Sequence, residues 1–254
     1  MLLLVVDTAG PTGGVLLART DWSVDGAAAT GQEIEILGVM ELHPRAFSAE
    51  LIPAVAELLR ASERRLADVG AFVAISGPGS FTGLRVGLSA VKAMAEATGK
   101  PILTLSRLAI LASVAARLTP SEMGDAAMHV VLDAGRGEFY HGVYRDAGNT
   151  RVAESFETFD ALVQKIDRQP GWVIVSEVSV KTAFQSVAGS RLREVASPSV
   201  RDALPLAVEE WRAGRFHDPV SVDANYLRRS DAVVVARTKA EPVAQAARVE
   251  DVRS

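Results

Sequence analysis

The chain has 254 residues, of which 48% are hydrophobic and 23% are charged, and its formal net charge at pH 7 is −4. It is long enough to bury one large core or two smaller ones, and its composition is that of a soluble globular protein. The negative charge excludes a global basic field that could hold nucleic acid unaided, and the lack of cysteine excludes disulfides, thiolate metal ligands and a cysteine nucleophile.

The first apolar run, at residues 2–6, ends in Asp7-Thr8. No basic segment precedes this run, and it is too short for a signal peptide or a membrane span. We therefore expect a cytoplasmic protein with no membrane partner.

Three strands are expected at the start of the chain. The run at 2–6 is followed by a turn at Gly10-Pro11 and a second apolar run at 15–18, which together predict a β-hairpin. Residues 33–42 alternate apolar and polar side chains less regularly, and this pattern predicts a third strand.

The periodicity then becomes helical. Leu51, Val55 and Leu59 are spaced four residues apart, which predicts a helix with Ser48 as its N-cap. Because proline is tolerated best in the first turn of a helix, Pro53 favours a start nearer Leu51.

A turn rich in glycine follows the buried strand that is predicted at 71–76. Gly77, Gly79 and Gly83 lie in this turn and open a helical pattern that continues to about Thr98. Backbone N–H groups at a helix N-terminus attract anions. The spacing nevertheless fits neither the dinucleotide fingerprint nor the Walker A loop. A phosphate site and a purely architectural turn both remain open, and we favour the architectural turn.

The rest of the chain repeats this order of elements. A strand at 101–105 and a helix at 108–118 complete a strand–helix alternation, which predicts parallel strands with right-handed crossovers. After a break at 119–121, a hairpin signal at 135–137 begins a second β-β-β-α-β-α unit, so the topology is duplicated. The elements expected in this second unit are strands at 128–133, 138–144, 152–157 and 172–175, and helices at 159–166 and 204–211.

A strand that ends in Asp7-Thr8 before a hairpin, followed by a second such unit, resembles the actin-like, Hsp70-like and sugar-kinase ATPase superfamily. Three motifs are similar to the TsaB (YeaZ) family: PGSFTGLRVG at 78–87, LDAGRGEFY at 132–140 and YLRR at 226–229. The resemblance covers nearly the whole chain. It implies an α/β fold of two actin-like (ASKHA, ribonuclease H-like) lobes, each with a mixed five-stranded sheet and helices.

The resemblance also implies a division of the chain. We expect residues 1–106 to form an N-terminal lobe that carries the partner-binding helices. Residues 107–229 would form a C-terminal lobe. Its last helix would either stay in this lobe or pack back on the first one. Residues 230–254 read as a tail.

In function, the resemblance implies a scaffold and dimerisation subunit for the formation of threonylcarbamoyladenosine in tRNA. Such a subunit binds and activates a TsaD-like catalytic paralogue, works with a TsaE-like ATPase, meets tRNA through the complex, and forms a homodimer when alone. ATP and a metal are expected on the TsaD-like partner, and no cofactor on this chain. The alternatives are a free-standing ATP-dependent kinase or ATPase of the same superfamily, and a homodimeric protein unrelated to tRNA.

No metal site or catalytic residue is expected in this chain itself. In the TsaD paralogue a His-x-x-x-His pair binds the metal, and the matching positions here are Arg107 and Leu111, which cannot do so. The histidines at 43, 129, 141 and 217 form no pair spaced four residues apart.

Nucleotide binding is weighed against a structural role. Asp7 and Thr8 stand where active superfamily members hold phosphate or Mg²⁺, but a turn-capping aspartate is the simpler interpretation. The turn at 176–179 lacks the glycine that close approach to an adenosine requires, which favours a degenerate ATPase fold. The candidates for an anion or nucleotide are Asp7, Thr8, Ser80, Thr82 and Arg85.

The helix expected at 82–98 supplies the case for a partner. It is apolar nearly all round apart from a stripe with Arg85, Lys92 and Glu96, so we expect burial on more than one side. The resemblance implies that this helix and the one at 51–59 dock on the partner. The residues expected at the partner interface are Leu51, Val55, Leu59, Gly83, Leu84, Gly87, Leu88, Val91 and Ala95.

Overall fold

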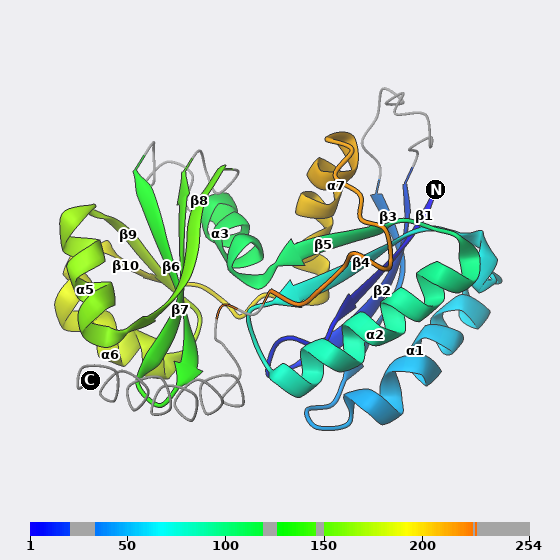
Figure 1. The fold of residues 1–254 in the computed structure, drawn as a ribbon, viewed down its shortest axis with the longest axis horizontal. Helices are drawn as coiled ribbons and strands as arrows, with labels where there is room; N and C mark the ends of the chain where they lie inside the picture. The colour runs from blue at the N-terminus through cyan, green and yellow to red at the C-terminus, as the bar shows by residue number, and fades with distance from the viewer. Residues whose placement is uncertain (21–33, 119–125, 146–149, 226, 228–254) are drawn as a thin grey trace, which may run out of the picture.

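The computed structural model describes residues 1–20, 34–118, 126–145, 150–225 and 227. Two lobes lie side by side, and each is built on one mixed sheet (Figure 1). The strand orders β3-β2-β1-β4-β5 and β8-β7-β6-β9-β10 are equivalent, so the expected duplication and the fold of two actin-like lobes are confirmed.

The first lobe follows the predicted order of elements closely. Its elements are β1 (Leu2–Asp7), β2 (Gly13–Thr20), β3 (Ile34–Leu42), α1 (Phe47–Ala61), the short 3₁₀ helix η1 (Leu66–Asp68), β4 (Val69–Gly77), α2 (Phe81–Thr98) and β5 (Ile102–Ser106). Helix α3 (Arg107–Leu118) follows, and its apolar side chains pack mainly with those of the second sheet. As predicted, β1 and β2 pair antiparallel, whereas β4 pairs parallel with both β1 and β5.

Alternation along β1 produces two apolar layers in this lobe. Leu4 and Val6 pack under α1 and α2, whereas Leu3 and Val5 face the opposite side of the sheet. Because successive side chains of a strand point to opposite faces, a short apolar run supports both layers at once.

The start of α1 differs from the prediction. The helix begins at Phe47 with Ala46 as its N-cap, and Ser48 is exposed inside the first turn. Burial of Phe47 fixes this start, together with the Glu50 carboxylate, which accepts the His43 N–H at 2.7 Å. Pro53 therefore lies one turn further inside the helix than the sequence suggested.

The second lobe contains two elements that the sequence analysis missed, α6 and β10. Helix α6 replaces the turn expected at 176–179, and its buried Val180, Phe184 and Ala188 are spaced four residues apart, a signal that was available in the sequence. The elements from this lobe to the end of the described chain are β6 (Ala127–Gly135), β7 (Glu138–Arg145), β8 (Thr150–Thr158), α5 (Phe159–Arg168), β9 (Gly171–Val175), α6 (Val178–Ala188), η2 (Gly189–Arg191), β10 (Leu192–Glu194), η3 (Val200–Ala203) and α7 (Leu204–Arg212).

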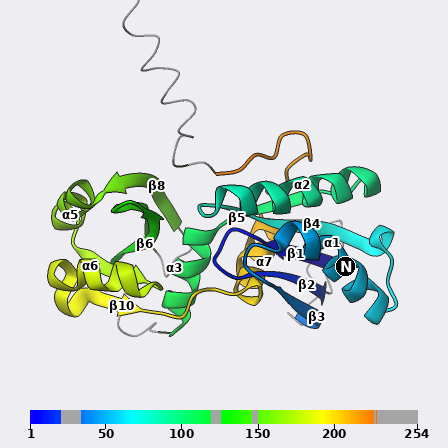
Figure 2. The ribbon, with the colours of Figure 1, turned by 90° about the horizontal axis from the view of Figure 1, so that it is seen from below.

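Helix α7 lies on the first sheet, on the face opposite α1 and α2 (Figure 1). The segment that follows it, residues 213–225, is here called the strap. The strap runs past the edge of β5, where His217 exchanges two backbone hydrogen bonds with Ile102. It then passes beside α2, where Val222 is buried in the same apolar cluster as Val91 (Figure 2).

The strap therefore covers a second side of α2. Lys92 Nζ donates to the Val222 carbonyl at 2.8 Å, which fixes the helix to the strap. The double burial expected for this helix is supplied in part by the chain itself. None of the described helices is long and apolar enough to cross a membrane.

Candidate functional site

The turn between β1 and β2 rests on a row of glycines at the start of α2. A Cβ atom at Gly79, Gly83 or Gly87 would lie 2.1 Å from Ala9 O, 2.0 Å from Thr8 O or 2.2 Å from Thr8 Oγ1, respectively. The neighbour is backbone at Gly79 and Gly83 and the Thr8 hydroxyl at Gly87, and only glycine permits so close an approach. The glycine spacing of this stretch thus has an architectural cause.

Hydrogen bonds hold the same contact. Thr8 Oγ1 donates to Gly83 O at 2.7 Å, and the Ser80 N–H donates to Ala9 O at 2.9 Å. Ser80 is the N-cap of α2, and its Oγ accepts the Gly83 N–H at 3.2 Å. Some of the amides that an anion would need are therefore already used within the chain.

Asp7 lies beneath this contact and is 6% exposed. Its carboxylate accepts the Ala9 N–H at 2.8 Å, which is the turn-capping geometry. Burial raises the pKa of the Asp7 carboxyl, while the Ala9 hydrogen bond and the charge of Arg107 act against that rise.

The structure brings only some of the anion candidates together. Asp7 and Thr8 are buried beside Ala9, and Ser80, which is exposed, donates its backbone N–H to Ala9 O. Thr82 and Arg85 are exposed on the outer side of α2, where the Arg85 guanidinium lies 3.7 Å from the centroid of the Phe81 ring.

Arg107, at the start of α3, lies at the junction of the two lobes and is 5% exposed. Its Nη1 is 4.0 Å from Glu177 Oε1, and its Nη2 is 3.4 Å from Ser197 Oγ. The sequence analysis considered this arginine only as a residue unable to bind metal. In the described part of the chain, no group of three or more His, Asp or Glu side chains is placed to hold a metal ion.

Glu177 connects this arginine to the second sheet. Its Oε2 accepts the Asp133 N–H at 2.7 Å, at the end of β6. Burial raises the pKa of the Glu177 carboxyl. This part of the junction therefore holds a buried cation between carboxyl groups from both lobes.

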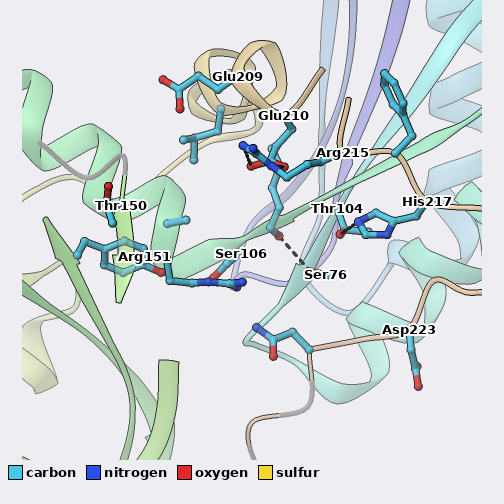
Figure 3. Close-up of a pocket in the computed structure, with 16 residues that line it drawn as sticks. Ser76, Thr104, Ser106, Thr150, Arg151, Glu209, Glu210, Arg215, His217 and Asp223 are labelled. Atoms are coloured by element: carbon cyan, nitrogen blue, oxygen red, sulfur yellow. Dashed lines mark hydrogen bonds and ion pairs between the residues drawn. The ribbon is translucent and has the colours of Figure 1, made fainter. Parts of the chain in front are cut away.

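A cavity of about 850 Å³ lies at another part of the junction, lined by the ends of β4 and β5, by β7, α7 and the strap (Figure 3). Two pairs of its polar side chains bond to each other. Figure 3 shows Glu210 facing Arg215, which bond at 2.6 Å, and His217 facing Thr104 at 3.1 Å.

A buried carboxylate stands behind this cavity. Glu154 Oε1 accepts from Tyr144 Oη, and Glu154 Oε2 accepts from Asn225 Nδ2 at 2.8 Å. Asn225 also donates its backbone N–H to Ser76 O at 2.8 Å. Burial and the Glu154 charge raise the pKa of Tyr144, so the phenol stays protonated. The strap is thus bonded to both lobes here.

The residues expected at the partner interface need correction, because all of them are buried in this chain's own core. Leu51, Val55 and Leu59 face the sheet from α1, and Gly83 and Gly87 face Thr8. Leu84, Leu88, Val91 and Ala95 are packed in the two apolar layers of the same lobe. Apolar spacing identified the inner face of each helix.

The outer surface of the two helices is made by other residues, which the sequence analysis did not select. Ile52 is 53% exposed and Phe81 is 43% exposed. The other exposed residues of this outer face are Ser48, Ala49, Pro53, Ala56, Glu57 and Arg60 on α1, and Thr82, Arg85, Ser89, Ala93, Glu96 and Ala97 on α2.

The chain matches a known family model over residues 39–191, more than half of its length. The model is that of TsaD, described as tRNA N6-adenosine threonylcarbamoyltransferase.

Individual relatives agree with this match. The chain is 29% identical, over 199 residues, to the tRNA threonylcarbamoyladenosine biosynthesis protein TsaB of Escherichia coli (strain K12), covering 75% of this chain and 84% of that protein. Over 70 residues it is 44% identical to a tRNA N6-adenosine threonylcarbamoyltransferase of Agrobacterium fabrum, covering 28% of this chain and 19% of the enzyme.

Among solved structures, the chain is similar to a protein of Pseudomonas aeruginosa described as having similarity to the peptidase YEAZ. The two are 26% identical with a TM-score of 0.66, and the match covers 89% of this chain and 99% of that chain.

Proposed function

This chain belongs to the TsaD family, on the branch of the TsaB (YeaZ) proteins of tRNA threonylcarbamoyladenosine biosynthesis, and we propose that it binds and activates a TsaD-like catalytic paralogue. In this role the chain is a scaffold subunit, and the transfer chemistry belongs to the partner.

The observation that carries the proposal is the outer face of α1 and α2, the surface defined above. Along the middle of α2 this face presents the short side chains of Ser89, Ala93 and Ala97, and on the neighbouring helix α1 Ile52 and Ala56 are exposed. Short side chains allow a second helix to approach closely, and an exposed apolar residue gives such a contact its driving force. Figures 1 and 2 place the two helices next to each other on the outside of the lobe.

The chain's likeness to the threonylcarbamoyltransferases supports a paralogous partner. Two chains of one fold can pair through equivalent surfaces about an approximate twofold axis. The same surface would form a homodimer when the chain is alone, and we include that homodimer in the proposal.

The remaining parts of the proposal follow from the family. ATP and a metal bind to the TsaD-like partner, and this chain carries no cofactor. A TsaE-like ATPase joins the complex, and tRNA binds through the complex. The assembly works in the cytoplasm.

Co-purification with the TsaD-like paralogue tests the proposal. Ala93→Arg places a long charged side chain in the middle of the outer face, so it is expected to abolish the complex without changing the fold. Gln185→Arg, on the exposed side of α6 in the other lobe, is the matched control and should leave the complex intact.

Two results would overturn the proposal. One is the absence of a complex with the unaltered chain, or a complex that both variants retain. The other is ATP turnover by the purified chain without a partner, which would support the kinase or ATPase alternative.

A further inference from the structure

One guanidinium group stands where three segments from different parts of the fold meet. Gly10 belongs to the β1–β2 turn, Glu177 is the N-cap of α6, and Ser197 lies between β10 and η3. A Cβ at Gly10 would lie 3.3 Å from Arg107 Nε and from Nη2, so the guanidinium rests against that turn. Its other contacts are the ones to Glu177 and Ser197 described above.

The charges at this point come from both lobes. Asp7 interacts electrostatically with Arg107 from the side of the first sheet, and Glu177 does so from the side of the second. Burial disfavours the ionised form of both carboxyl groups, and the charge of Arg107 favours it. Each carboxylate is also bonded to the backbone of its own lobe, at Ala9 and at Asp133.

We propose that Arg107 is an interlobe latch, a resident cation that joins the two lobes at this point of the junction and fixes them in one relative orientation. The latch joins the glycine-supported β1–β2 turn to the start of α6, two segments that otherwise belong to separate sheets. This inference does not depend on the proposed partner.

The geometry calls for arginine and not merely for a positive charge. A guanidinium presents donors in several directions from one rigid plane, so it can face Glu177 and Ser197 while resting on Gly10. A lysine ammonium is a compact point charge on a flexible stem and cannot hold these contacts together.

A second link between the lobes provides an internal reference. Glu154 on β8 bonds to Asn225 of the strap, and this link shares no residue with the Arg107 contacts. Loss of the latch is therefore expected to loosen the junction around Arg107 and to leave the Glu154–Asn225 link intact. General destabilisation would loosen both.

Pulsed electron paramagnetic resonance on the full chain tests the latch. Because the sequence has no cysteine, Ala67→Cys and Gln164→Cys place two unique spin labels on exposed positions of the two lobes. We expect one narrow distance distribution in the parent chain and a clearly broader one with Arg107→Met. Arg60→Met removes the ion pair with Glu57 inside α1, within a single lobe, so it is the control and should keep the narrow distribution.

Hydrogen exchange gives the second readout. With Arg107→Met, amides at 8–12 and 177–181 should exchange about tenfold faster, while those around Glu154 and Asn225 keep their protection. If Arg107→Met does not fold, Arg107→Lys retains the charge without the fork and is expected to give the same pattern more weakly. A narrow distribution with unchanged exchange in a folded variant would overturn the latch, as would equal acceleration at both links.

Discussion

His129 Nδ1 lies 3.0 Å from His141 Nε2, and the two buried imidazole rings stack with their planes 6° apart. His129 Nε2 is 2.7 Å from the Gln169 carbonyl oxygen. Because a carbonyl oxygen can only accept a hydrogen bond, Nε2 carries the proton. His129 Nδ1 must then be the acceptor and His141 Nε2 the donor. In this arrangement each neutral ring carries one N–H, and protonation of both rings would set two N–H groups against each other.

This pair predicts a loss of stability in mild acid. Burial lowers the pKa of His129, and the charge of Arg191 lowers it further. Burial lowers the pKa of His141 to about 3, with Lys165 adding to this shift and Glu157 opposing it. Below the ordinary histidine pKa the unfolded chain binds more protons than the folded chain, so the free energy of unfolding falls as pH falls from about 6.5 towards 3. Between pH 6.5 and 5, His141 alone should contribute a loss of about 2 kcal/mol.

Chemical denaturation at pH 7 and pH 5 measures this loss. His141→Leu should flatten the dependence, whereas His43→Gln, at a side chain that is 83% exposed, should leave it as steep as in the parent. An equally steep dependence in His141→Leu would place the acid sensitivity elsewhere.

The glycine row predicts a strong local sensitivity of the fold. Gly83→Ala sets a methyl group 2.0 Å from Thr8 O, and because backbone cannot yield cheaply, we expect a destabilisation of about 1–3 kcal/mol. Ser89→Ala, on the exposed side of the same helix, should change stability by less than about 0.5 kcal/mol. Thermal and urea unfolding of the two variants provide the comparison, and equal stabilities would contradict the contact.

The hydroxyl of Thr8 predicts a related but smaller effect. Thr8→Val keeps the shape and loses the buried bond to Gly83 O, at an expected cost of about 1 kcal/mol. Thr8→Ser keeps the donor and tests whether the hydroxyl or the methyl group matters. If valine is tolerated better than serine, packing and not the hydrogen bond supports this turn.

The strap predicts opposite results at two valines of one segment. Val222 is 5% exposed under α2, and Val220 is 81% exposed. Val222→Ala should lower the free energy of unfolding by about 2 kcal/mol, through lost burial and the cavity it leaves. Val220→Ala should be nearly neutral. If urea unfolding shows that Val222→Ala loses as little stability as Val220→Ala, the strap is not part of the core.

Much of the architecture could be predicted from local patterns. Apolar spacing located most of the helices and strands, and the repeated order of elements gave both sheets their topology. The start of α1 was misplaced because burial of Phe47 outweighs the capping preference of Ser48. Helix α6 was missed because residues 176–179, which lead into it, suggested a turn.

The candidate surface could not be predicted in the same way. Spacing shows which residues of α2 share a face, but the same small and apolar residues suit the chain's own sheet and a partner equally well. Only the tertiary structure shows that Gly83 and Gly87 face Thr8 and that Ser89 and Ala93 face outward.

The sequence by itself therefore determined the family, the duplicated sheets and the glycine-rich start of α2, because these depend on periodicity and local motifs. The tertiary structure alone decided what that start touches, what Arg107 joins, and which side of α2 is exposed. These features depend on contacts between segments far apart in the chain, and such contacts leave no periodic trace in the sequence.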